Sequence, residues 1–179
     1  ASLIVGYYLG QLYQRQPLAD LSAVVYPNGR ALTYPAEIEL SSGDADAGIW
    51  RLFVVGDTGA PACRDLLRHY ALVFNRLAHR PELQHRLRVT LLAYDRPDAA
   101  SRAVFTAGAD RVEVIAAPRP ALDGLSGQLG IAPVAQDWCT STQANAVLVA
   151  PDAVAWALIP FEQTAIMAHD IATIIDFVE

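Results

Sequence analysis

Two short apolar runs constrain the fold of this chain more than any other feature. The runs are IWRLFVVG at 49–56 and LRVTLLAYD at 87–95, and nearly continuous apolar runs of this length are typical of strands buried on both faces. Between them, residues 61–79 place apolar side chains within an arc of about 100° on a helical wheel. A strand, a helix and a second strand in this order predict a βαβ unit. The helical stripe comprises Leu66, Tyr70, Val73, Phe74 and Leu77.

The rest of the chain supplies the remaining parts of an α/β domain. Right-handed crossovers predict a mixed central sheet flanked by helices on both faces. An N-terminal β-hairpin is expected to turn at Pro27-Asn28-Gly29. A βαβ unit followed by a hairpin and a closing helix is the thioredoxin-like arrangement. The further elements expected are a hairpin in 18–32, a short helix or loop at 96–108, a strand at 112–116, a helix at 118–130, a hairpin at 145–160 and a helix at 164–178.

Length and apolar content indicate one domain. With 179 residues, 53% of them hydrophobic, the chain can bury a substantial core without metals or many disulfides. No repeat or linker interrupts residues 17–179, which are expected to form a single domain. The apolar start, residues 1–16, is interpreted either as an amphipathic helix or as the outer end of a membrane anchor, and both remain open.

The charged residues exclude several functional classes. A net charge of −6 argues against a nucleic-acid partner. All 13 basic residues are arginine, so Schiff-base catalysis and a phosphate-loop lysine are both excluded. The two cysteines are too few for a disulfide scaffold, but they could form one bridge in an oxidising compartment.

Several segments after residue 18 match one branch of the thioredoxin-like fold. Cys63 lies near the start of the long helix, Pro81-Glu82-Leu83 at its end and Asp95-Arg96-Pro97 after the second strand. The segments VEVIAAPRPALDGLSGQLGIAP and NAVLVAPDAVAWALIPFEQTAIMAHDIATIIDF continue the match toward the C-terminus. In this order they resemble the SCO/SenC family of cytochrome c oxidase assembly proteins. The resemblance implies a periplasmic or extracytoplasmic domain, anchored by an N-terminal helix, whose partner is a respiratory oxidase subunit or an assembly factor.

The resemblance also identifies where copper would bind in such a protein. Members of the family bind copper through two loop cysteines and a histidine just before the final hairpin. Here Cys63 matches the second cysteine, but Gly59 stands at the first cysteine position and Thr142 near the histidine position. No histidine lies between His85 and His169. The resemblance therefore implies a degenerate copper site, and copper is not expected as a cofactor.

Cys63 has two interpretations when it is considered alone. In the first turn of the expected helix, unpaired N–H groups, the helix dipole and Arg64 favour a thiolate. On the helical wheel, however, Cys63 also projects toward the apolar stripe, where a buried thiol is inert.

Cys139 widens the choice, because the resemblance places it in a loop that folds over Cys63. Three interpretations remain open for the pair. A structural disulfide would stabilise the domain by roughly 4–5 kcal/mol through the entropy of loop closure. Alternatively, the cysteines are two unlinked thiols without a joint role. Finally, they form a reversible dithiol or a Cu(I) site with two thiolates.

The function expected from these features is that of an SCO-like accessory protein for cytochrome c oxidase assembly, acting as a protein-binding module. One alternative is a thiol-disulfide oxidoreductase or peroxidase-like enzyme that uses Cys63 and Cys139. The other is a Cu(I)-binding protein with a two-cysteine site. His79 and His85 lack the spacing of metal ligands, and His169 is expected on the solvated side of the last helix.

Overall fold

Six strands form one mixed sheet in the computed structural model, which describes residues 18–40, 48–107, 111–131, 139 and 145–179. The sheet order is β1-β6-β5-β2-β3-β4. Strands β2, β3 and β4 run parallel, whereas β5 pairs antiparallel with β2, and β6 pairs antiparallel with both β5 and β1. The strands are β1 (Val24–Ala31), β2 (Trp50–Gly56), β3 (Leu87–Ala93), β4 (Val112–Ile115), β5 (Ala146–Val149) and β6 (Val154–Ile159).

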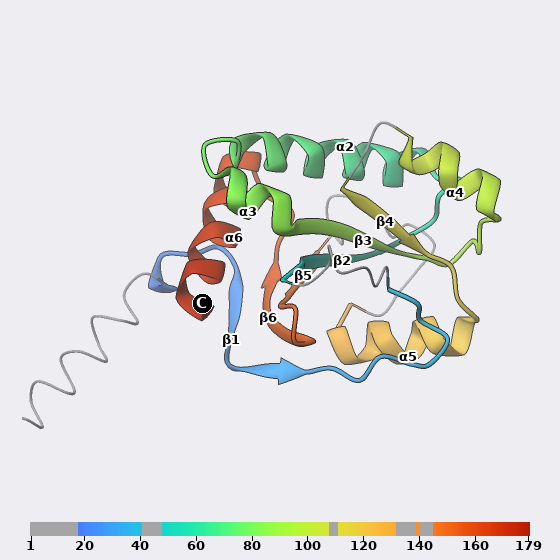
Figure 1. Cartoon of the computed structure of the whole chain (residues 1–179), viewed down its shortest axis with the longest axis horizontal. Helices are drawn as coiled ribbons and strands as arrows, with labels where there is room; N and C mark the ends of the chain where they lie inside the picture. The colour runs from blue at the N-terminus through green and yellow to red at the C-terminus, as the bar shows by residue number, and fades with distance from the viewer. Residues whose placement is uncertain (1–17, 41–47, 108–110, 132–138, 140–144) are drawn as a thin grey trace, which may run out of the picture.

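Helices cover both faces of the sheet (Figure 1). Side chains alternate along β2, so that Trp50, Leu52 and Val54 pack toward α2 and α6. Phe53 and Val55 pack toward α5 on the opposite face. Every residue of β2 is buried, as expected for a strand between two layers of helices. The helices are α2 (Pro61–Arg76), α3 (Pro81–Arg86), α4 (Ala99–Thr106), α5 (Arg119–Leu129) and α6 (Thr164–Val178).

Helix α2 forms as the apolar periodicity predicts. Proline occupies its first position, where no backbone N–H is needed, and the expected stripe is buried throughout. The helix ends at Arg76 rather than near His79, and a separate short helix, α3, begins at Pro81. Sequence periodicity did not reveal α3 as a separate element, because six residues are too few to show a helical period.

The expectation of an N-terminal hairpin is wrong. The segment around Pro27-Asn28-Gly29 lies within a single edge strand, β1, which pairs with β6 on both sides of a register shift between Val25 and Arg30. Gly29 has a φ of 64°, and a Cβ there would overlap Cγ1 of Val154. Residues that suit a tight turn also suit this bulge, because both need a positive φ and a close approach of the backbone.

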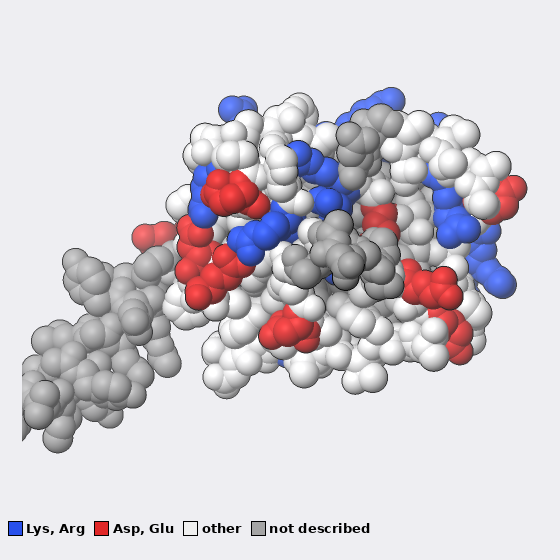
Figure 2. Space-filling view, viewed as in Figure 1, with Lys and Arg blue, Asp and Glu red and all other residues white. Residues whose placement is uncertain are grey.

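Helix α6 packs on the same side of the sheet as α2. Met167, Ile171, Ile174 and Ile175 are buried as expected, and His169 is exposed. The end of α6 is joined to the α3 region by ion pairs, and Figure 2 shows acidic and basic atoms side by side over this part of the surface.

The expectation for residues 1–16 lies outside the described residues. Within the described part of the chain, no helix combines the length and the apolar character that a membrane crossing requires.

Candidate functional site

A disulfide joins the start of α2 to the segment that precedes β5. The Cα atoms of Cys63 and Cys139 are 4.8 Å apart, and 76 positions separate the two residues in sequence. The structure therefore contradicts the interpretation as two unlinked thiols, and the bond agrees both with a structural disulfide and with the oxidised state of a reversible dithiol. Both cysteines are buried, with exposed fractions of 2% for Cys63 and 6% for Cys139.

Backbone groups at the end of β2 contact both sulfur atoms. The N–H of Asp57 donates to Sγ of Cys63 at 3.2 Å, and the carbonyl oxygen of Val55 lies 3.6 Å from Sγ of Cys139. Gly56, between them, has no side chain to keep the disulfide away. A Cβ at this position would lie 2.7 Å from Sγ of Cys139 and 2.9 Å from Sγ of Cys63, which is closer than such atoms approach. The position of the disulfide therefore requires a glycine at position 56.

We expect Gly56→Ala to lower the free energy of unfolding by about 2 kcal/mol, because the added methyl group overlaps both sulfurs and Cδ1 of Leu91. Urea titration of the oxidised proteins measures the change. The matched control is Gly124→Ala in α5, where a Cβ meets nothing within 4 Å. This control should gain up to about 1 kcal/mol, because alanine favours a helix over glycine. Equal behaviour of the two variants would contradict the close packing at Gly56.

Two carboxylates lie at the same edge of the sheet as the disulfide. Asp57 directly follows β2 and Asp95 follows β3, and these strands are parallel neighbours. Thr58 donates its hydroxyl proton to Oδ2 of Asp95. The N–H of Gly59 donates to Oδ1 of Asp57 at 2.8 Å and to Oδ2 of Asp95 at 3.2 Å. These bonds fix the loop that leads from β2 to α2.

The two carboxyl groups titrate differently. Burial raises the pKa of Asp57, and a hydrogen bond shared with Asp95 raises it further. Burial also acts to raise the pKa of Asp95, but the hydrogen bonds from Thr58 and Gly59 outweigh it, so that this pKa is lowered.

We expect opposite pH effects for substitutions in this pair. The raised pKa of Asp57 favours folding at low pH and loses this contribution as the pH rises, so Asp57→Asn should gain stability relative to wild type between about pH 3 and pH 7. The lowered pKa of Asp95 favours folding above its unfolded value, so Asp95→Asn should lose stability at about pH 7 and recover part of it at about pH 3. Both changes should stay near 1 kcal/mol, because the groups are only partly buried. Urea titrations across this range measure them, and changes of the same sign would contradict the assignment.

At the two expected copper positions that the structure describes, no side chain is placed to bind a copper ion. Gly59 offers no side chain, and the sulfur of Cys63 is bonded to Cys139 rather than ionised. Thr142 lies outside the described residues. Among the residues that the structure describes, no three His, Cys, Asp or Glu side chains are grouped to hold a metal ion.

The burial of the disulfide limits its reaction with thiols. Thiol-disulfide exchange requires an incoming thiolate to reach one sulfur of the bridge. The two sulfurs belong to side chains that are almost fully buried, so this edge must open before exchange can begin. The bond links the start of α2 to a residue that packs against the end of β2.

Sequence reasoning missed Gly56, Asp57 and Asp95 as parts of this site. Asp57 and Asp95 each follow a buried strand, and the carboxyl ends of parallel strands meet at one edge of a sheet, so the order of elements held a signal for both. Gly56 gave no such signal, because its role depends on sulfurs that reach it from other elements.

No protein-family model matches the chain, and no curated protein matches its sequence. Solved structures do match it. Apo Sco1 from Thermus thermophilus is 14% identical with a TM-score of 0.62, and the match covers 87% of this chain and 96% of that one. Copper-bound yeast Sco1 is 13% identical with a TM-score of 0.59, covering 72% and 78% of the two chains. Copper-bound ScoI from Bradyrhizobium japonicum is 13% identical with a TM-score of 0.53, covering 72% and 85%. The chain therefore has the thioredoxin-like fold of these proteins, and the resemblance to the SCO family is confirmed at the level of the fold.

Proposed function

We propose that this protein is an SCO-like accessory factor for the assembly of a respiratory cytochrome c oxidase, and that it acts by binding a protein partner rather than by carrying copper. One observation carries the second half of the proposal. Cys63, which corresponds to a copper ligand of the SCO family, forms a buried disulfide with Cys139, and Gly59 stands at the position of the other loop cysteine. The fold is retained, but the described part of the site offers copper no thiolate.

We place the protein on the extracytoplasmic side of a membrane. A buried cross-link between distant parts of the chain supports this location, because such bonds form and persist in oxidising compartments. An anchor in residues 1–16 remains part of the proposal, and so does an oxidase subunit or assembly factor as the partner.

Deletion of the gene in its host tests the proposal. We expect a loss of assembled oxidase, measured by haem absorbance and oxygen consumption, that added copper does not repair. Complementation with a Cys63→Ala, Cys139→Ala variant should restore assembly if the protein folds at the growth temperature. A defect that copper salts repair would instead indicate copper delivery, and the absence of any defect would remove the assembly role.

The bridged cysteine pair also keeps a thiol-disulfide oxidoreductase as a second candidate, because such an enzyme has this bond in its oxidised state. The test is the rate at which a small-molecule thiol reduces the bond in the folded protein. A rate no faster than that for an ordinary exposed disulfide would exclude the enzyme. A Cu(I) titration of the reduced protein against a strong chelator tests the two-cysteine copper site in the same way.

A further inference from the structure

The two sulfurs of the disulfide have different neighbours, although they are bonded to each other. The N–H of Asp57 donates to Sγ of Cys63 at 3.2 Å, whereas Sγ of Cys139 lies 3.6 Å from the carbonyl oxygen of Val55. An N–H donor stabilises a sulfur that gains negative charge, and a carbonyl oxygen destabilises it. When the bond opens, these contacts therefore favour a thiolate on Cys63 and a neutral thiol on Cys139, whose S–H can donate to the carbonyl group.

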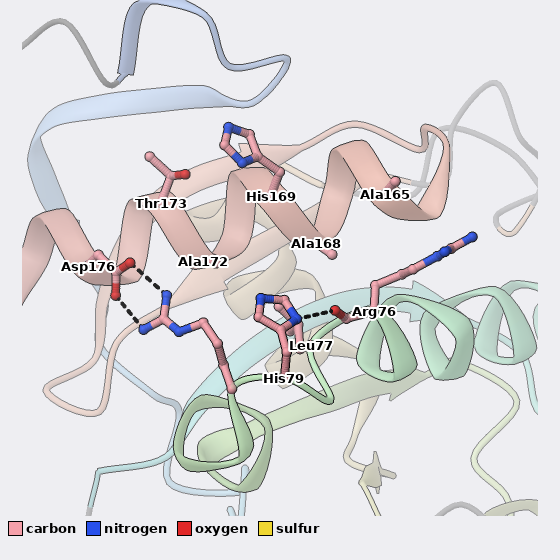
Figure 3. A pocket seen from close by; sticks show the side chains of 10 residues that line it. Arg76, Leu77, His79, Ala165, Ala168, His169, Ala172, Thr173 and Asp176 are labelled. Atoms are coloured by element: carbon pink, nitrogen blue, oxygen red, sulfur yellow. Dashed lines mark hydrogen bonds and ion pairs between the residues drawn. The ribbon is translucent and has the colours of Figure 1, made fainter.

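The N-terminal end of α2 adds to this difference. Cys63 is the third residue of the helix, where the positive end of the helix dipole stabilises an anion. Among the described residues, no side chain caps this end and no acidic residue lies in the first turn. At the other end of α2, the ring of His79 donates from Nδ1 to the carbonyl oxygen of Arg76 at 3.0 Å (Figure 3). A side chain thus compensates the C-terminal end of the helix, whereas the N-terminal end is left to act on Cys63.

Charged groups farther from the bridge act on both sulfurs. Asp57 and Asp95 disfavour a thiolate at this edge of the sheet, whereas the exposed Arg64, which follows Cys63, favours one. Coulomb energies change slowly with distance, and the sulfurs are bonded to each other, so these charges affect both of them to similar extents. The N–H donor, the carbonyl contact of Cys139 and the helix end therefore decide which sulfur carries the charge.

We propose that an incoming thiolate attacks Sγ of Cys139 and that Cys63 is the leaving group. A disulfide forms between the incoming sulfur and Cys139, the bond between the two cysteines breaks, and its electron pair leaves on Cys63 as a thiolate. This thiolate can attack Cys139 again, which restores the bridge and releases the incoming thiol unchanged. Alternatively, a second thiol attacks the incoming sulfur, so that two thiols are oxidised to a disulfide and both cysteines are reduced.

This proposal rests on the second candidate function, because it assigns the roles of the two cysteines in thiol-disulfide exchange. Burial agrees with the assignment. Neither sulfur is open to solvent, and Cys139 is the less buried residue, with an exposed fraction of 6% against 2% for Cys63. The incoming thiol therefore meets Cys139 first when this edge of the sheet opens.

Mass spectrometry identifies the attacked sulfur. The oxidised, folded protein is treated with reduced glutathione and quenched with acid while most of it is still bridged, and its free thiol is then alkylated with a maleimide before peptide mapping. We expect glutathione on Cys139 and the maleimide on Cys63 at least about tenfold more often than the reverse, since a hydrogen bond to a charged sulfur favours one thiolate by such a factor. Exchange of glutathione between the two cysteines leaves this expectation unchanged, because the more stable thiolate is also favoured at equilibrium.

Substitutions at Ala62 test the cause of the preference. Ala62 is exposed and lies in the first turn of α2, next to Cys63. Ala62→Glu places a carboxylate at the positive helix end and should lower the preference about two- to fivefold at low salt. Ala62→Gln adds a side chain of the same size without the charge and should behave as wild type does.

Several outcomes would overturn the assignment. These are glutathione on both cysteines equally, glutathione chiefly on Cys63, no mixed disulfide until the protein is denatured, or the same distribution in the two Ala62 variants. The rate of exchange separates this inference from the second candidate function. Slow exchange with the expected distribution would exclude the enzyme and leave the assignment standing. Rapid exchange with glutathione on Cys63 would support the enzyme and contradict the assignment.

Discussion

The Cys63→Ala, Cys139→Ala protein should unfold with a free energy about 4–5 kcal/mol lower than that of the oxidised wild type. The bridge closes a loop of 76 positions, and loop closure of this length restricts the unfolded chain by about that amount. Because a domain of this size is stable by only about 5–15 kcal/mol, the loss removes a large part of the total. Urea titration at neutral pH measures it.

Reduced wild-type protein is the control for this prediction. It keeps both sulfur atoms, so it separates the loss of the cross-link from the loss of buried side-chain volume. We expect the reduced protein to lose most of the same free energy, with a small remainder due to the cavities left by alanine. A change below about 1 kcal/mol in both proteins would show that the bond contributes little to the fold.

Placing a cysteine and a histidine at the positions that the family resemblance assigns to copper ligands should create a Cu(I) site. The variant carries Gly59→Cys and Thr142→His, together with Cys139→Ser to release Cys63 from the disulfide. Two thiolates and an imidazole are a ligand set that suits Cu(I). The backbone at position 59 can carry a side chain. The φ of Gly59 is not positive, and a Cβ there would come within 4 Å only of Oδ1 of Asp57, at 3.2 Å. We expect the reduced variant to retain about one Cu(I) against a strong chelator.

Two further proteins identify the cause of any gain. Cys139→Ser alone leaves a single thiolate and should release its copper to the chelator. Replacing the new cysteine by Gly59→Ser in the same background keeps the size of the side chain but removes the soft ligand, and copper retention should be lost with it. If the Cys139→Ser protein already retains copper, then a ligand other than those at positions 59 and 142 is present, and the proposal of a lost site is wrong.

Local patterns in the sequence predict most of the fold, because they reflect burial. β2 and β3 are recognisable since nearly every side chain is apolar, and α2 since its apolar positions recur at helical spacing. The cysteine count allowed one bridge between Cys63 and Cys139, but only the family resemblance placed the two residues close together. Pro27-Asn28-Gly29 was misread because a turn and a bulge use the same residues.

The contacts of the site were harder to predict for a physical reason. Asp57 and Asp95 meet because β2 and β3 pair in one particular register, and α2 meets α6 because both helices pack on the same face of the sheet. Such relations between distant residues depend on the complete packing of the chain, and they leave little trace in the local order of side chains.

The order of strands in the sheet has a consequence for biogenesis. The first strand pairs with the last, and β2 is completed only by β3 and β5, the latter beginning at Ala146. The N-terminal third of the chain holds β1 and β2, which do not pair with each other, so it cannot form any part of the sheet before later strands have been synthesised. β2 can pair with β3 once Ala93 has been synthesised, but β1 pairs with β6, which is complete only at Ile159, so the β1 edge of the sheet forms late in synthesis.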